Sequence, residues 1–102
     1  MRLSEQQQQD IIECVTQHIS IDARIWLFGS RVDDAKKGGD IDLYIQVDDL
    51  EDIFMRTIRC RLALEDRWGA RKVDLLVHDT VTEPELAIHA IAQHEGIRLD
   101  AH

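Results

Sequence analysis

The chain has 102 residues, which is enough for one domain, residues 1–102, but not for two. Hydrophobic residues make up 44% and charged residues 31%, no apolar run approaches the roughly 20 residues that cross a bilayer, and the N-terminus lacks the apolar region of a signal peptide, so we expect a cytoplasmic protein with no membrane partner. The net charge of −8 argues against a nucleic-acid substrate, because phosphate binding needs a basic footprint.

The first elements are a capped helix and a buried strand. Ser4 and Gln7 form a capping-box pattern, which predicts a helix from about Glu5 to His18. The nearly continuous apolar run RIWLF predicts a strand at Arg24–Phe28 that is buried on both faces. A Gly-Ser pair then ends the strand, and a short helix or loop follows over residues 31–39.

The next segment, Asp40–Val47, alternates apolar and polar residues and predicts a strand with one core face and one polar face. Its odd-numbered residues, all apolar, point to the core. Its polar face carries Asp40, Asp42, Tyr44 and Gln46, and we expect Tyr44 to fill the strand edge rather than to stack on a base.

A long helix is predicted from Leu50 to about Trp68, with Asp48 or Asp49 as N-cap and Gly69 just past its end. The i, i+4, i+8 spacing predicts that its core-facing stripe consists of Phe54, Ile58 and Leu62. The arginines of this helix would then lie on the opposite side, as a solvated face or a docking surface: Arg56, Arg59 and Arg67.

The C-terminal third predicts a strand, a helix and a short edge strand. Lys72–Val77 alternates, with Asp74 on the non-core side. The residues 82–85 (TEPE) form a second capping-box pattern for a helix that runs to about His94 and ends at Gly96, and residues 97–99 follow as a short edge strand. This order predicts an α/β (α+β) fold with one small mixed sheet flanked by helices.

The cysteines and histidines carry no recognisable motif. Cys14 and Cys60 fit neither a disulfide framework nor a zinc site, so we expect reduced thiols with packing or surface roles. The five histidines show no ligand spacing, and we interpret them as structural or surface residues.

The carboxylates on the predicted strands are the strongest indication of chemistry. Alternate residues on a strand lie about 6.5–7 Å apart on one face, so Asp40 and Asp42 can converge on one site. They would repel each other unless cations lay between them, and two Mg²⁺ ions about 3.5–4 Å apart, the usual arrangement for displacement at phosphorus, fit that spacing. Asp74, on a neighbouring strand, would supply a third carboxylate.

The Gly-Ser turn supplies a complementary phosphate site. Gly29 allows the backbone to bend tightly and expose its N–H groups, and the Ser30 hydroxyl can hold phosphate oxygens. Arg31 can neutralise a triphosphate further. The sequence therefore predicts a site for a nucleoside triphosphate and magnesium.

With GSR at 29–31, DIDLYI at 40–45 and KVDLLV at 72–77, the sequence resembles the minimal nucleotidyltransferases of the DNA polymerase β-like superfamily, over nearly the whole chain. The resemblance implies a polymerase β palm-like nucleotidyltransferase fold. It also implies that Gly29 and Ser30 bind phosphate, that Asp40 and Asp42 bind two Mg²⁺ ions, and that Asp74 is the third ligand and the base toward the acceptor hydroxyl.

The resemblance is to the branch whose members are antitoxins of HEPN-domain ribonuclease toxins. It implies transfer of AMP from ATP to a hydroxyl, here a tyrosine of the partner HEPN-type toxin. The loop from Arg31 to Gly39 is one residue shorter than the usual family pattern, and Gly39 replaces a serine. Two alternatives therefore stay open: an adaptor with a weak nucleotide site that neutralises its partner by docking, and a nucleotidyltransferase acting on a small molecule.

Overall fold

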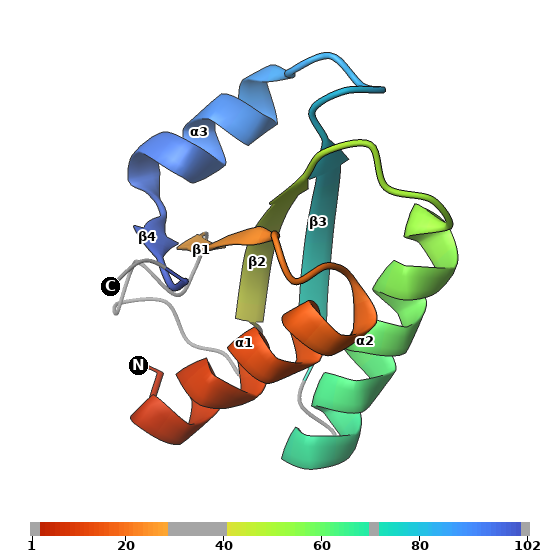
Figure 1. Cartoon of the computed structure of the whole chain (residues 1–102). Coiled ribbons are helices and arrows are strands. Elements are labelled where there is room, and N and C mark those ends of the chain that lie inside the picture. Colours follow the sequence, from red (N-terminus) through yellow and green to blue (C-terminus); the bar gives the residue numbers. More distant parts are fainter. Residues whose placement is uncertain (1–2, 29–40, 70–71, 101–102) are drawn as a thin grey trace.

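The computed structural model describes residues 3–28, 41–69 and 72–100. Within these ranges the chain forms three helices and one four-stranded mixed sheet with the strand order β3-β2-β1-β4 (Figure 1). This confirms the expected fold class. The elements in chain order are α1 (Glu5–His18), β1 (Arg24–Phe28), β2 (Ile41–Val47), α2 (Ile53–Trp68), β3 (Val73–Asp79), α3 (Ala87–Glu95) and β4 (Ile97–Arg98).

The sheet is mixed because β1 runs antiparallel to both β2 and β4, whereas β2 and β3 are parallel. The parallel pair is joined by α2, as such a crossover requires. Figure 1 shows α1 and α2 together on one side of the sheet and α3 on the other. The two parallel strands therefore have helices on both faces.

Helix α1 begins where the capping box predicts. The Gln7 backbone N–H donates to Ser4 Oγ at 3.1 Å, and the Ser4 N–H donates to Gln7 Oε1 at 2.9 Å. Further along the helix, Asp10 accepts hydrogen bonds from Arg67 Nη1 and Trp68 Nε1, both at 2.9 Å. These bonds join α1 to the last turn of α2.

Strand β2 is buried on both faces, which corrects the expected polar face. Its odd-numbered residues belong to the main core under α1 and α2. On the other face Tyr44 is fully buried in a second, smaller core with Trp26 and Ala92 of α3. Tyr44 therefore does not fill a strand edge, because α3 covers it.

Helix α2 begins at Ile53, three residues later than predicted, and its N-cap position is Asp52, which makes no capping hydrogen bond through its side chain. The loop before it contains two residues with left-handed backbone, Asp49 (φ 54°) and Asp52 (φ 57°), a conformation that aspartate tolerates better than most residues. Gly69 follows the helix with φ 74°, as its C′ position predicts.

The predicted core stripe of α2 was wrong. Phe54 is 73% exposed and Leu62 is 56% exposed, so these residues face away from the sheet. The buried residues of the helix are Cys60 and Leu64. Each lies about half a turn from the predicted stripe, so the helix is rotated from the predicted orientation.

The C-terminal third follows the predicted order with shifted bounds. Strand β3 continues to Asp79, two residues past the prediction, and α3 begins only at Ala87, so the second capping box does not form. At its C-terminal end α3 passes into β4 through Gly96, where a Cβ would lie 2.3 Å from the Ala92 carbonyl oxygen and 3.0 Å from that of Leu27. Only glycine, which has no Cβ, fits at position 96.

Across the ranges that the structure describes, none of the helices is both long enough and apolar enough to traverse a lipid bilayer.

Candidate active site

Two of the predicted site residues, Asp42 and Asp74, lie side by side. They are register partners in the parallel pair β2–β3, so their side chains leave the same face of the sheet from strands about 4.8 Å apart. Both are near the N-terminal ends of their strands. Asp42 is half-buried and Asp74 is exposed. The register therefore brings together two carboxylates that are 32 residues apart in the sequence.

The neighbouring strand β1 ends beside Asp42, at the end of the sheet where β2 and β3 begin. Its last residue, Phe28, is the register partner of Asp42. The remaining predicted site residues lie outside the described residues: Gly29, Ser30, Arg31 and Asp40. Their roles in phosphate and metal binding stay predictions.

The carboxylates of Asp42 and Asp74, at the N-terminal ends of β2 and β3, suit a hard cation. Within residues 3–28, 41–69 and 72–100, no group of three or more His, Cys, Asp or Glu side chains is arranged to hold a metal ion. Asp42 and Asp74 nevertheless supply two carboxylates on one face, and Mg²⁺ is commonly bound by one or two carboxylates together with substrate phosphates. The donor chemistry therefore fits magnesium, with Asp40 as the further ligand that the sequence predicts.

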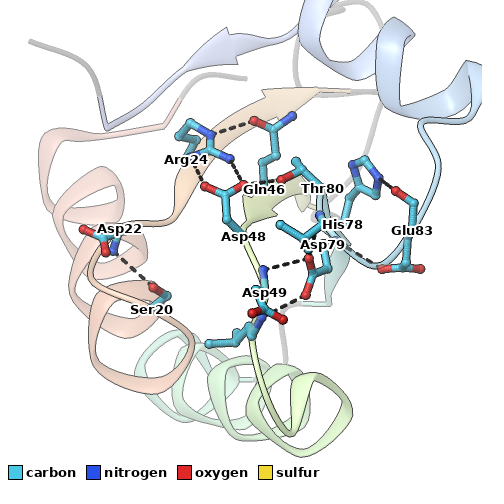
Figure 2. A network of polar contacts seen from close by, with 12 residues as sticks. Ser20, Asp22, Arg24, Gln46, Asp48, Asp49, His78, Asp79, Thr80 and Glu83 are labelled. Carbon is cyan, nitrogen blue, oxygen red and sulfur yellow. Dashed lines mark hydrogen bonds and ion pairs between the residues drawn. The ribbon is translucent and has the colours of Figure 1, made fainter.

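At the opposite end of the parallel strands, a buried carboxylate organises the loops. Asp79 accepts hydrogen bonds from the backbone N–H groups of Asp49, Leu50, Val81 and Thr82, at 2.8 to 3.2 Å. Figure 2 shows the bond from Asp49 to Asp79. Burial raises the pKa of Asp79, but the backbone N–H groups outweigh it and hold the pKa well below the ordinary value. Asp79 therefore stays ionised and joins the loop before α2 to the loop after β3.

A second set of polar contacts lies beside it and is also structural. Arg24 donates to Gln46 Oε1 at 2.6 Å and forms a two-pronged ion pair with Asp48 at 2.9 and 3.1 Å (Figure 2). Thr80 Oγ1 also donates to Asp48. The hydrogen bonds from Arg24 and Thr80 lower the pKa of Asp48. Asp48 therefore holds strand ends together instead of capping α2.

The expected structural role is confirmed for two buried histidines, His78 of β3 and His89 of α3, but their pairing was not predicted. The rings of His78 and His89 stack with centroids 3.9 Å apart, and the Tyr44 hydroxyl lies 3.0 Å from His78 Nδ1. His89 Nδ1 accepts a hydrogen bond from the Leu86 backbone N–H at the start of α3. Burial, followed by the neighbouring His78, lowers the pKa of His89. The only signal in the sequence was that His78 has the same strand parity as Asp74.

The two cysteines pack in the core. Cys14 and Cys60 are both buried and reduced. Burial raises the pKa of both thiols, that of Cys60 to about 12. Such thiols are unreactive at neutral pH, which confirms a packing role.

The comparison with known proteins identifies the family of the chain. No curated protein matches the chain. A family model described as "Polymerase beta, Nucleotidyltransferase" matches residues 9–99, a range that contains Asp42 and Asp74 and runs from within α1 to the end of β4. The chain therefore belongs to the polymerase β nucleotidyltransferase family.

Proposed function

We propose that the protein is a magnesium-dependent nucleotidyltransferase that transfers AMP from ATP to a hydroxyl group. Members of its family typically use divalent metal ions and nucleoside triphosphates. The observation that supports the proposal most directly is the register of β2 and β3, which aligns Asp42 with Asp74 on one face. Two carboxylates aligned on one face are a donor set by which Mg²⁺ is commonly bound together with substrate phosphates.

Each residue has a distinct task in this proposal. Asp40, Asp42 and Asp74 hold two Mg²⁺ ions, which would neutralise phosphate charge and polarise the reacting phosphoryl group. Ser30, the backbone around Gly29 and Arg31 orient the β- and γ-phosphates of ATP. Asp74 is on β3, at the edge of the described sheet, and is exposed, so it is the carboxylate best placed to take the proton of an incoming hydroxyl.

The acceptor in this proposal is a tyrosine of a HEPN-type toxin, so that the protein acts as an antitoxin in the cytoplasm. A domain of 102 residues has little surface from which to build its own acceptor pocket. The acceptor hydroxyl then has to be positioned by contacts from the rest of the acceptor molecule, and a protein is large enough to make such contacts. Transfer of AMP forms a bond between the tyrosine oxygen and the α-phosphorus of ATP, breaks the α–β phosphoanhydride bond and releases pyrophosphate. It adds a bulky anion to the toxin.

Substitution of Asp42 by Asn tests the catalytic proposal. We expect Asp42→Asn to lower the transfer of labelled AMP from α-labelled ATP to the toxin by at least about 100-fold, because it removes a metal-binding charge. Asp66→Asn, which removes one charge from the exposed side of α2, is the matched control and should retain activity. Full activity in Asp42→Asn, with an unchanged circular dichroism spectrum, would refute the role.

The alternative is an adaptor that neutralises its partner by docking without transfer. The shortened loop from Arg31 to Gly39 favours it, because that loop carries the predicted phosphate contacts. One titration of the toxin, with and without ATP and Mg²⁺, separates the two functions. A tight complex that acquires no label supports the adaptor, whereas a mass increase of one AMP on the toxin supports the transferase.

A further inference from the structure

Helix α2 has a second apolar face that no other described part of the chain covers. We call it the outer face of α2, and it consists of Phe54, Met55, Ile58 and Leu62. Three of these side chains are 73%, 45% and 56% exposed, and Ile58 is half-buried. Isolated exposed apolar residues are ordinary, but a contiguous group marks an interaction site.

The spacing of the outer face makes it a continuous stripe. Phe54, Ile58 and Leu62 are four residues apart, so they follow one another on one side of the helix, with Met55 beside them. The stripe extends over about 12 Å of helix. The opposite side packs on the main core through Cys60 and Leu64. A helix that is apolar on two sides is typical of one packed between two partners, and the described chain supplies only one.

Two arginines flank the stripe, and the acidic residues Glu65 and Asp66 follow it one turn further along the helix. At about 100° per residue, Arg61 lies along one edge and Arg59 along the other. Both arginines are exposed, and neither makes a hydrogen bond or an ion pair with another described residue. Arg56 and Arg67 differ, because Arg56 donates to the Ile19 carbonyl oxygen and Arg67 pairs with Asp10. Two unpaired cations beside an apolar stripe stand out in a chain of net charge −8.

We propose that the outer face of α2 is a docking surface for an amphipathic helix of another protein, whose apolar stripe is bordered by acidic residues. The apolar stripe supplies the contact area, and the two arginines select partners with carboxylates at the edges of the contact. A second copy of this chain fits less well, because two chains of net charge −8 repel each other.

The other exposed apolar residues on a helix provide a contrast. Ile88 and Ile91 of α3 are 43% and 48% exposed. The exposed charged residues near them are acidic, Glu85 and Glu95, so an acidic helix would be repelled there. These two isoleucines therefore serve as a control pair of exposed apolar residues on another helix.

The docking surface is separate from the carboxylates of the candidate active site. Helix α2 packs on the sheet face that carries the odd-numbered residues, whereas Asp42 and Asp74 lie on the α3 face. The inference therefore stands on its own and does not depend on nucleotidyl transfer. Variants of the outer face should leave metal-dependent ATP binding unchanged.

The test uses two labelled synthetic helices and the full chain. Both peptides carry leucines at i, i+4, i+7 and i+11, and the flanking positions are glutamates in one and lysines in the other. Fluorescence anisotropy should show that the glutamate peptide binds at least about tenfold more tightly than the lysine peptide, a difference of about 1.4 kcal/mol. Phe54→Ser with Leu62→Ser should weaken binding of the glutamate peptide by at least about tenfold, and Ile88→Ser with Ile91→Ser should not.

Charge reversal completes the test. Arg59→Glu with Arg61→Glu should reverse the preference, so that the lysine peptide binds more tightly. The proposal is overturned if the two peptides bind equally, if neither binds saturably, or if the α3 variant loses as much affinity as the α2 variant. It is also overturned if the chain alone sediments as a dimer that Phe54→Ser with Leu62→Ser converts to a monomer, because the surface would then be a self-interface.

Discussion

At the scale of the residue, the most connected side chain is that of Asp79. It is 1% exposed, and it remains charged because four backbone N–H groups converge on its two oxygens. Asp48, which the sequence favoured as a helix cap, instead binds Arg24 and Thr80 on the outside of the same loops. Both carboxylates have clear structural partners, whereas Asp74, on the same strand as Asp79, makes no hydrogen bond or ion pair with another residue in the described ranges.

Substitution of Asp79 by Asn should lower the melting temperature by roughly 10 °C at pH 7. In the unmodified chain the Leu50 backbone N–H donates to Asp79 Oδ2. The asparagine amide has one acceptor oxygen in place of two, and its NH₂ group would face the Leu50 N–H, which then loses its acceptor. Asp22→Asn, in an exposed loop, is the control and should melt like the unmodified chain.

The same carboxylate predicts acid sensitivity. Because the folded state holds the pKa of Asp79 below its ordinary value, its contribution is complete above about pH 4–5 and is lost as the pH falls toward the folded pKa. Between about pH 5 and pH 3, the urea midpoint should therefore fall less steeply in Asp79→Asn than in the unmodified chain. Equal slopes in the two proteins would contradict this explanation.

At the scale of the element, α2 shows where sequence patterns stop being informative. Its start lies three residues after the predicted one, but its C-terminal end follows from local chemistry, with Gly69 where a C′ glycine is expected. Its orientation does not, since both Phe54 with Leu62 and Cys60 with Leu64 repeat at helical spacing. The sheet decides which set is buried, and the more hydrophobic set is left outside.

Helix α3 shows a tertiary contact overriding a local signal. The capping-box pattern at residues 82–85 is intact in the sequence, but the Thr82 N–H is already bound to Asp79 and the Glu83 carboxylate accepts from the Asp79 N–H. The helix therefore begins at Ala87, where the His89 ring accepts from the Leu86 N–H. The pairing of His78 with His89, eleven residues apart on different elements, leaves no periodic trace in the sequence.

The histidine pair should make the attachment of α3 depend on pH. Burial and His78 lower the pKa of His89. As the pH falls, this histidine therefore binds a proton more readily in the unfolded chain than in the folded chain. The stability from this group is complete above the ordinary histidine pKa of about 6.5 and declines as the pH falls from there toward the folded pKa.

His89→Gln should remove that decline, since glutamine at this position can accept from the Leu86 N–H as in a capping box but does not titrate. Urea midpoints at pH 7.5 and 5.5, with hydrogen exchange of the α3 amides, measure the effect. His94→Gln, on the exposed side of the same helix, is the control and should keep the full pH dependence. If the urea midpoint of His89→Gln depends on pH as strongly as that of the unmodified chain, another group takes up the proton.

At the scale of the whole molecule, the face of a strand on which each residue lies was more predictable than the packing against that face. Strand parity alone placed Asp42 and Asp74 away from the main core, and the chain order of strand, helix, strand implies parallel neighbours. The register, which brings Asp42 and Asp74 together, depends on how α2 packs and could not be derived from spacing. The buried state of Tyr44 was unpredictable for the same reason, because only the folded chain lays α3 over that face.

The paired carboxylates predict a trade-off between stability and function. Without metal, Asp74→Asn should raise the melting temperature by about 2–4 °C, because it relieves repulsion with Asp42 on the neighbouring strand. Asp66→Asn removes the same charge from the chain of net charge −8 at a distant position, so the difference between the variants isolates the local repulsion. Mg²⁺ with a non-hydrolysable ATP analogue should raise the melting temperature of the unmodified chain and that of Asp66→Asn equally, and that of Asp74→Asn by much less. If Asp74→Asn melts lower than the unmodified chain in EDTA, the carboxylate is a structural residue and is not held in place for a cation.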